Sequence, residues 1–454
     1  MTSSPTAAQP ALDRSALLTW YRRIRARSQA LFDLLADETA YYSQPIALRH
    51  PIVFYEGHLP AFSLNTLVKT ALGRPGIDPQ LETLFARGID PDTTASAAPQ
   101  PPEHHRARWP RREAVRAFAA EADARIADAL AHADLDVPGH PLLNRAEAVF
   151  TILEHEVMHQ ETLLYIWHRL PLAHKRCPEG YRPRLDGHAP ATEWIEIPAG
   201  RATLGVAPSE ISFGWDNEFG PLVEDVPAFW IARHDVTNAE YIEFVEAGGY
   251  GDPHWWEPEA WAWLRHDGVR HPLFWERHDG RWYWRGMFDL LPLPPAWPAY
   301  VSQAEAAAFA RWRGARLPTE AEFQRAAYGT PDGDERRFPW GDAPPDAEHG
   351  VFDFATWDPG PVGSHPAGRS AWGVDDLVGN GWEWTRTPFA PFPGFTPMAS
   401  YPQYSADFFD GRHFVMKGAS PATGRELLRP TFRNWFRPYY PYVYATFRCV
   451  RGES

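Results

Sequence analysis

Two histidines in one apolar stretch are the residues of this chain best suited to metal chemistry. His155 and His159 lie four positions apart in residues 148–170, where apolar residues recur at helical spacing and no Gly or Pro occurs before Pro171. Positions four apart project from the same face of a helix, one turn apart, so both imidazoles can bind one ion. The alternative is a pair of core histidines satisfied by hydrogen bonds. The metal site is favoured because buried acids are rare unless they are paired or tied to metal ligands, and this run contains Glu154, Glu156 and Glu161.

The segment supports two kinds of metal site. Residues 155–159 read H-E-x-x-H, the pattern of a metalloprotease with Glu156 as general base, and Glu179 lies where one such class keeps its third ligand. The same residues also begin an H-x-x-x-H-x-E pattern, whose glutamate is Glu161. Glu161 lies about 200° around the helix from His159, which fits a supporting role better than ligation. Glu179 falls in a proline-flanked turn, and this weighs against the protease.

Composition excludes several classes of function. The chain has 454 residues and a formal net charge of −14, which argues against nucleic acid and anionic membranes as partners. No apolar run approaches the length of a membrane span, and the first fifteen residues lack the apolar core of a signal peptide. Only two cysteines occur, Cys177 and Cys449, far apart in the sequence. We therefore expect a cytoplasmic protein with free thiols.

The first part of the chain has the pattern of a helical bundle. Apolar stripes or strong helix formers predict four helices, over residues 12–38, 52–72, 111–132 and 148–170. His58 lies in the second of these, where a lone histidine is more often packed than a ligand. Residues 73–100 are rich in Asp, Pro and Ala and are predicted to form a loop. Histidines facing inward from two helices predict a bundle with a metal site in its core.

The remainder of the chain differs in kind. Residues 171–192 are rich in Pro and Gly and are predicted to be a linker, and after Glu193 the apolar runs are short and broken by Gly, Pro, Asp and Trp. A hairpin is predicted within residues 193–205, and a strand is predicted at the C-terminal end. Helices are predicted to begin after N-caps at Thr237 or Asn238, Ser302 and Thr319. This texture predicts an irregular α+β domain whose loops shape a pocket.

Residues 193–454 resemble the formylglycine-generating-enzyme-like (sulfatase-modifying factor) domain, which has a C-type-lectin-like fold. The resemblance is carried by five motifs: Pro198-Ala199-Gly200, Trp215-Asp216-Asn217-Glu218, residues 236–241 (VTNAEY), residues 316–322 (RLPTEAE) and residues 379–385 (GNGWEWT). Formylglycine-generating enzymes use a copper-binding cysteine pair. Cys177 and Cys449 do not resemble that pair, so this chemistry is not implied.

Residues 12–170 resemble the DinB-like bundle that precedes this domain in the ergothioneine and ovothiol sulfoxide synthases and in selenoneine synthase. The carriers are residues 48–62 (LRHPIVFYEGHLPAF) and residues 155–161 (HEVMHQE). The resemblance implies three histidine ligands to non-haem iron(II): His58, His155 and His159. The expected fold is α+β, with a DinB-like four-helix bundle over residues 1–170, a linker over 171–192 and a C-type-lectin-like domain over 193–454.

The family reaction implied by the resemblance uses iron(II) and O₂ to join sulfur or selenium to the imidazole of histidine or hercynine (trimethylhistidine). Iron suits this reaction because it is redox-active, and three histidines leave positions open for substrates. Tyr401, in the segment Tyr401-Pro402-Gln403-Tyr404, corresponds to the family's donor of a proton or hydrogen atom. Its alternative is a core aromatic residue. The substrate-binding residues implied for the small-molecule partners are Asn434, Trp435, Phe436, Tyr404 and Trp382.

Two departures from the pattern of ergothioneine-type enzymes indicate which sulfur or selenium donor to expect. Ergothioneine-type enzymes commonly place an acid after the Trp that corresponds to Trp435, where this chain has Phe436, and several place Gln where it has Met158. Selenoneine synthase, which uses a selenosugar, is then the closest pattern. The alternatives are a sulfoxide synthase using γ-glutamylcysteine or cysteine, and a catalytically degenerate module that keeps the fold and binds ligands.

Overall fold

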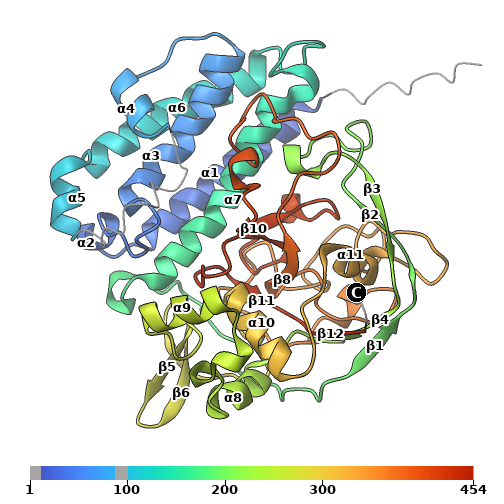
Figure 1. The fold of residues 1–454 in the computed structure, drawn as a ribbon. Coiled ribbons are helices and arrows are strands. Elements are labelled where there is room, and N and C mark those ends of the chain that lie inside the picture. Colours follow the sequence, from blue (N-terminus) through green and yellow to red (C-terminus); the bar gives the residue numbers. More distant parts are fainter. Residues whose placement is uncertain (1–11, 87–100, 453–454) are drawn as a thin grey trace, which may run out of the picture. The chain divides into compact units, whose positions relative to one another are not determined.

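The computed structural model describes residues 12–86 and 101–452, and its contacts divide the chain between His159 and Gln160 into two compact units. The expectation of no signal peptide rests largely on residues 1–11, which lie outside the described residues. Residues 87–100, the second half of the predicted loop, also lie outside them. Figure 1 shows helices in the N-terminal unit and mixed helices and strands in the C-terminal unit. The α+β prediction is confirmed.

Four long helices dominate the N-terminal part of the chain, as predicted: α1 (Arg14–Asp33), α3 (Ile52–Ser63), α6 (Arg112–His132) and α7 (Glu147–Arg169). The Asp13 side chain accepts a hydrogen bond from Ala16 N at 3.0 Å and caps α1. The apolar stripe of α1 is buried against the bundle, at Leu17, Tyr21, Ile24 and Leu31. Two short helices, α2 (Glu38–Tyr41) and α5 (Pro102–Arg108), also lie in this region.

The predicted second helix is largely buried, and the loop predicted after it contains a helix. Every residue of α3 is buried, including Pro60 inside the helix, and the chain continues as a π-helix over Leu64–Ala71. Residues 73–100, predicted as a loop, contain helix α4 (Pro79–Leu84), capped by Asp78. The loop prediction was wrong there. Proline is compatible with the first position of a helix, so the composition of this stretch did not reveal that a helix begins at Pro79.

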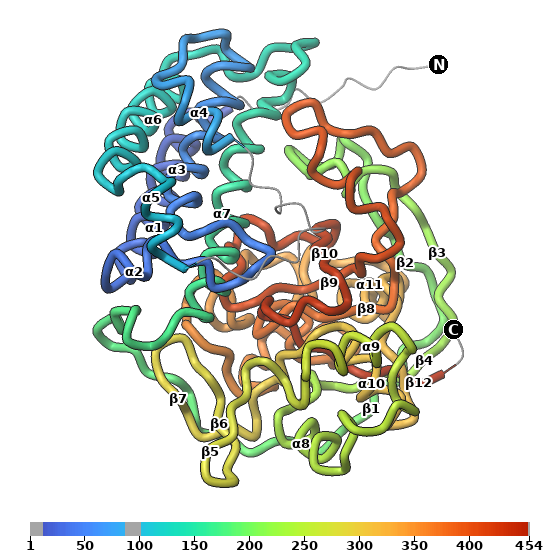
Figure 2. Tube along the Cα trace, turned by 60° about the vertical axis from the view of Figure 1, so that its left-hand side comes forward, coloured from blue at the N-terminus to red at the C-terminus, as the bar shows by residue number. Residues whose placement is uncertain are grey.

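The central sheet of the C-terminal unit has four strands in the order β10-β9-β8-β11. They are β10 (Asn434–Phe436), β9 (Phe414–Ala419), β8 (Gly381–Pro388) and β11 (Ala445–Thr446), with β11 parallel to β8 and the other pairs antiparallel. Figure 2 allows β10, β9 and β8 to be followed as neighbours. The motif GNGWEWT therefore forms the start of a central, buried strand.

The hairpin predicted within residues 193–205 is wrong in its pairing, although both strands exist. Strand β1 (Trp194–Ile197) pairs with β4 (Phe229–Ala232), and β2 (Gly200–Leu204) pairs with β3 (Leu222–Val226). Alternation of apolar residues predicts a strand but does not choose its partner. The predicted C-terminal strand is likewise reduced to two short pieces, β11 and β12 (Val450–Arg451).

Helices of the C-terminal unit begin at the predicted caps. Thr237, rather than Asn238, caps α8 (Asn238–Glu246), Ser302 caps α10 (Gln303–Trp312) and Thr319 caps α11 (Glu320–Tyr328), each with a glutamate at the third helical position. Helix α11 contributes to the core that also contains β2 and β4. The other elements are α9 (Pro258–Asp267) and a three-stranded sheet of β5 (Trp275–His278), β6 (Arg281–Arg285) and β7 (Leu290–Pro292).

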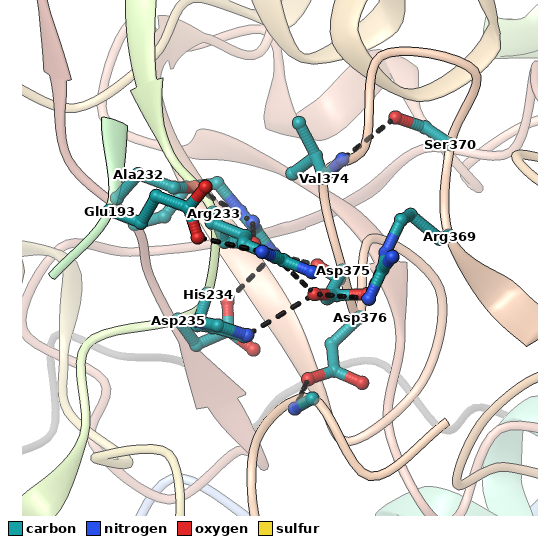
Figure 3. A network of polar contacts seen from close by, with 12 residues as sticks. Glu193, Ala232, Arg233, His234, Asp235, Arg369, Ser370, Val374, Asp375 and Asp376 are labelled. Atoms are coloured by element: carbon teal, nitrogen blue, oxygen red, sulfur yellow. Dashed lines mark hydrogen bonds and ion pairs between the residues drawn. The ribbon is translucent and has the colours of Figure 1, made fainter. Parts of the chain in front are cut away.

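A network of buried and partly exposed charges ties distant segments of the C-terminal unit together, and Figure 3 shows the part around Asp375. Asp375 accepts hydrogen bonds from Arg233 Nε at 2.8 Å and from Arg369 Nε at 2.7 Å. Arg448, fully buried, donates to both carboxylate oxygens of Glu383 and to Asp235 at 2.6–3.1 Å. The charges are paired and hydrogen-bonded, as buried ions must be.

No helix in the described ranges is both long and apolar enough to cross a bilayer.

Candidate metal centre and substrate-binding residues

Three histidines from two helices meet in the core of the N-terminal unit. His58 comes from α3, and His155 and His159 come from α7. One ring nitrogen of each lies within 4.8 Å of the others, and this is the one such group of three or more possible metal-binding side chains found among the described residues. His58 and His155 are buried, and His159 is partly exposed. The spacing seen in the sequence thus places the pair on one face, and the fold adds the third ring.

Aromatic residues one turn from the histidines hold the rings in place. The Phe62 ring stacks on His155 with centroids 3.5 Å apart, and the Phe54 ring stacks on His58 at 4.9 Å. Both phenylalanines lie on α3, at positions four residues on either side of His58, where a helix brings side chains onto one face. The apolar sequence of α3 therefore serves to orient imidazoles as well as to fill the core.

Hydrogen bonding prepares His58 for a ligand. Its Nδ1 donates to the carbonyl oxygen of Phe85 at 2.7 Å, which leaves the lone pair on Nε2. Nε2 of His58 and Nδ1 of His159 are buried and have no hydrogen-bond partner among the residues described. An orphaned buried nitrogen is costly unless something binds it. The donor set fits a divalent transition metal.

Burial also keeps the rings neutral. It lowers the pKa of His58 to about 4 and lowers the pKa of His155 and His159 well below the usual value, with the neighbouring rings adding to the effect. Only neutral imidazole has a lone pair to offer a metal. The cluster is thus in the protonation state that ligation requires over the whole neutral pH range.

Phe85 contacts the histidine cluster, and no sequence pattern predicted this contact. It lies just after α4, in the stretch predicted to be a loop, and its role uses a backbone carbonyl, which any residue could supply. Gly57 offers the clearest signal of this contact. A Cβ at Gly57 would lie 2.5 Å from the Phe85 ring, so the position before His58 must be glycine for the two segments to approach.

Glu156 has a structural role. Its carboxylate accepts hydrogen bonds from Arg25 Nη1 at 2.8 Å and from Ser28 Oγ at 2.5 Å, both on α1. Arg25 in turn binds Asp123 on α6. Through its Oε1 atom Glu156 therefore ties α7 to α1 and, through Arg25, to α6, whereas its Oε2 atom is buried and has no hydrogen-bond partner among the described residues. Glu179 is exposed in the linker.

Glu161 is buried within the C-terminal unit, two residues after His159. Its carboxylate accepts hydrogen bonds from Trp382 Nε1 at 2.8 Å, Ser420 Oγ at 2.7 Å and Thr423 Oγ1 at 3.2 Å. Burial raises its pKa to about 7, against the opposing effect of these hydrogen bonds. Trp382, expected to bind substrate, is 1 % exposed and packs on Phe432. Its indole N–H is thus already committed to Glu161.

The two tyrosines of the Tyr-x-x-Tyr segment lie close together and are half-buried. Their ring centroids are 5.8 Å apart, and Tyr404 N donates to Tyr401 O at 3.0 Å, which closes a turn. Tyr404 stacks on Trp215 at 4.0 Å. Tyr404 is thus fixed by packing, whereas Tyr401 lies at the start of the turn.

The residues expected to bind the imidazole substrate form strand β10 at the edge of the central sheet. Asn434, Trp435 and Phe436 are all half-buried. Trp435 stacks on Phe389 with centroids 4.2 Å apart, and Phe436 stacks on Tyr440 at 5.0 Å. The strand therefore presents partly accessible aromatic surface and an amide, a combination suited to a planar, cationic small molecule.

Two family models match the chain in order. Residues 21–163 match the DinB superfamily, and residues 183–453 match the sulfatase-modifying factor enzyme 1-like domain. The second match covers more than half of the chain. The chain is thus similar to proteins in which a DinB region precedes a sulfatase-modifying factor enzyme 1-like domain.

Relatives with both regions narrow the class. Hercynine oxygenase of Mycolicibacterium smegmatis is 36 % identical over 345 residues, which cover 74 % of this chain and 77 % of that protein. Ergothioneine biosynthesis protein 1 of Neurospora crassa is 28 % identical over 490 residues, covering 90 % of this chain and 54 % of that protein. The chain belongs to the sulfatase-modifying factor enzyme 1-like family, in the branch that contains these biosynthetic enzymes, and is an oxygen-dependent oxidoreductase.

A third relative matches the C-terminal region. The protein named inactive C-alpha-formylglycine-generating enzyme 2 of Bos taurus is 30 % identical over 310 residues, covering 59 % of this chain and 91 % of that protein. The fold of this region by itself therefore does not imply chemistry.

Proposed function

We propose that this protein is an iron(II)- and O₂-dependent enzyme that joins selenium or sulfur to the imidazole ring of hercynine, and that its donor is a selenosugar, which would make it a selenoneine synthase. The observation that carries the proposal is the cluster of three imidazoles, two of them buried and one partly exposed, in which His58 and His159 each have a ring nitrogen without a hydrogen-bond partner among the described residues. The named relatives supply the substrate class, since one of them is called a hercynine oxygenase.

In the proposed reaction, hercynine loses one ring hydrogen and the donor loses one hydrogen from sulfur or selenium. O₂ accepts four electrons, one oxygen atom leaving as water and the other ending on sulfur or selenium, so the product is a sulfoxide or selenoxide. Iron held by His58, His155 and His159 would supply the redox chemistry and the positions for O₂ and the thiolate or selenolate. His58 and His155 are 0 % and 2 % exposed, which limits the access of water to these two rings.

Tyr401 is proposed to donate the proton or hydrogen atom. A phenol has a pKa of about 10 and is protonated at neutral pH, and a correctly held donor contributes roughly 10²–10⁴-fold in rate. Tyr401→Phe removes only the hydroxyl. We expect bond formation to fall at least tenfold while oxidation of the thiol or selenol donor rises, measured by mass spectrometry of both products. Tyr404→Phe is the matched control, and a shift in Tyr404→Phe alone would transfer the role to Tyr404.

Hercynine binding is proposed at β10. The trimethylammonium group favours aromatic faces through cation–π contact. Trp435 and Phe436 supply such faces on the strand that carries Asn434, and Tyr440 stacks on Phe436. The Asn434 Oδ1 atom accepts from Trp435 N at 2.9 Å, which leaves its amide N–H groups to donate to an imidazole nitrogen. Asn434→Ala is expected to raise KM for hercynine more than it lowers kcat.

The selenosugar is proposed because Phe436 stands where an acid would contact an amino-acid thiol, and a stacked aromatic ring has no charge to offer an ammonium group. The names of the relatives favour the second candidate, a sulfur donor such as γ-glutamylcysteine or cysteine. Competition of a 1-selenosugar, γ-glutamylcysteine and cysteine over one iron-loaded sample decides between them. The selenosugar should give product fastest; a clear win for either thiol would make the chain a sulfoxide synthase.

The remaining alternatives are separated by the same preparation. A catalytically degenerate module should show neither stoichiometric iron nor O₂ uptake with hercynine and any donor. A metalloprotease should cleave casein and should lose that activity in Glu156→Gln. His159→Ala should lose iron and turnover under the proposed function, and full iron occupancy in that variant would reject the ligand set.

A further inference from the structure

The motif Trp215-Asp216-Asn217-Glu218 forms a buried turn that has no part in the proposed chemistry. It spans the short helix Asp216–Glu218 and its N-cap, and none of the four side chains is more than 2 % exposed. A buried aromatic residue, an amide and two carboxylates in consecutive positions are costly to accommodate unless each has a dedicated partner. Glu218 Oε1 accepts from Trp215 N within the motif, and most of the other side-chain hydrogen bonds of these residues are made with two other segments of the same unit.

One set of contacts holds the segment that carries the two tyrosines. Ser405 Oγ donates to Asp216 Oδ1 at 2.5 Å and accepts from Asn217 Nδ2 at 2.9 Å. The other Asp216 oxygen accepts from Met398 N at 3.4 Å. Trp215 also stacks on Tyr404. The turn therefore contacts the tyrosine segment, residues 398–405, at Met398, Tyr404 and Ser405. Tyr401 lies between these points.

A second set of contacts holds the chain that enters β10. Glu218 accepts two hydrogen bonds from Arg429, at 2.7 and 2.6 Å, and one from Thr431 Oγ1 at 2.6 Å. The backbone oxygen of Asn217 accepts from Arg433 Nη1 at 3.3 Å. Arg433 directly precedes Asn434, and its guanidinium is also held by Glu320 of α11 at 2.8 and 2.9 Å, so the turn is one of the contacts that hold the chain entering β10.

We propose that this turn is a positioning device that sets Tyr401 relative to the imidazole-binding strand, with Asp216 and Ser405 holding the donor tyrosine and Glu218 and Thr431 holding Asn434. The inference rests on the proposed function, because it assigns a purpose to holding Tyr401 and Asn434 together. A displacement of about 1 Å in such a pair is enough to change rates strongly. Burial raises the pKa of Asp216 to about 6, and the hydrogen bonds from Ser405 and Met398 oppose that rise.

The test removes one hydroxyl from each of the two sets of contacts, that of Ser405 from the first and that of Thr431 from the second. Ser405→Ala in the iron-loaded full chain should lower the ratio of bond-forming product to oxidised donor about fivefold to tenfold, the factor of one lost buried hydrogen bond. Thr431→Val should raise KM for hercynine about threefold to fivefold and leave that ratio unchanged. A loss of folded protein lowers both products together, so a changed ratio cannot come from general destabilisation.

Two further variants serve as controls. Ser405→Thr restores a hydroxyl and should recover most of the product ratio. Ser302→Ala removes a hydroxyl that is equally buried but caps α10, and should lower stability without changing the product ratio. If Ser405→Ala gives the same ratio as Ser302→Ala, the positioning role is rejected.

A readout without turnover keeps the two proposals separate. Hydrogen–deuterium exchange should increase over residues 398–405 in Ser405→Ala and over residues 429–434 in Thr431→Val, with α3 unchanged in both. If the unsubstituted chain forms no product, the proposed function fails, and exchange alone decides whether the turn holds the two segments. Exchange at 398–405 that matches that of Ser302→Ala would reject the device in either case.

Discussion

The histidine cluster of the N-terminal unit and the charge network of the C-terminal unit are both buried and polar, yet they satisfy opposite rules. Around Arg448 every guanidinium nitrogen has a partner, from Glu383, Asp235 or backbone oxygens. In the cluster, His58 Nε2 and His159 Nδ1 have none among the described residues. The fold alone satisfies the Arg448 guanidinium and leaves Asp235 Oδ2 as a single atom without a partner among the described residues, whereas two orphaned nitrogens that converge on one point are best explained by an external ligand. The comparison separates groups that support the structure from groups that act.

The largest expected effect tests the cluster. His159→Leu fills the space of the ring with apolar atoms, so the free energy of unfolding of the metal-free protein should change by less than about 1.5 kcal/mol. Iron binding should fall at least 100-fold, and iron at about 100 times its Kd should stabilise the unsubstituted chain by about 2.7 kcal/mol and the variant by no more than about 0.4 kcal/mol. Metal analysis and urea unfolding with and without iron provide the measurements. A large loss of stability in the metal-free variant would make the cluster structural.

The second prediction breaks the network. Arg448→Met leaves the buried carboxylates of Glu383 and Asp235 without their cation and should lower the free energy of unfolding by about 3–5 kcal/mol, measured by urea unfolding. Arg369→Met is the control, because that side chain also binds a buried carboxylate but is itself 36 % exposed, so its loss should cost about 1 kcal/mol or less. Equal effects in the two variants would remove the distinction between buried and exposed pairs here.

The third prediction concerns the residue that orients His58. In Gly57→Ala the new methyl group would lie 2.5 Å from the Phe85 ring, so Phe85 and its carbonyl must move. Iron affinity should fall about 10-fold to 100-fold, as expected when the partner that orients a ligand is lost. Gly251→Ala, where no heavy atom lies within 4 Å of the added carbon, should bind iron normally. Unchanged affinity in Gly57→Ala would show that the Phe85 carbonyl is dispensable.

The smallest expected effect comes from a lone buried amine. The Nζ of Lys175 has no hydrogen-bond partner in the described ranges, and burial lowers its pKa from 10.5 to about 7. Because the unfolded chain holds the proton between these values and the folded chain does not, the stability of the protein should rise with pH from 7 to 10.5. Lys175→Met should be more stable by about 1–2 kcal/mol at pH 7 and lose this advantage near pH 10, measured by urea unfolding. An equal advantage at both pH values would contradict the assignment.

The sequence by itself determined the local elements. Apolar periodicity predicted the four long helices to within a few residues when α3 is counted with the π-helix that follows it, except that α1 ends five residues early. The cap residues Thr237, Ser302 and Thr319 marked helix starts. The spacing of His155 and His159 was sufficient to place both on one face. These features depend on neighbours within one or two turns, and the chain carries that information directly.

Only the tertiary structure decided which distant residues meet. It paired β1 with β4 and β2 with β3, against the expected hairpin, because register and partner depend on packing far along the chain. It brought His58 to the histidine pair 97 and more positions away, turned Glu156 toward Arg25 and set the Phe85 carbonyl against His58. A sequence motif identified residues 215–218, but the positioning role proposed for them depends on partners some 180–220 positions away. Such contacts are selected by burial and complete hydrogen bonding, which no local pattern encodes.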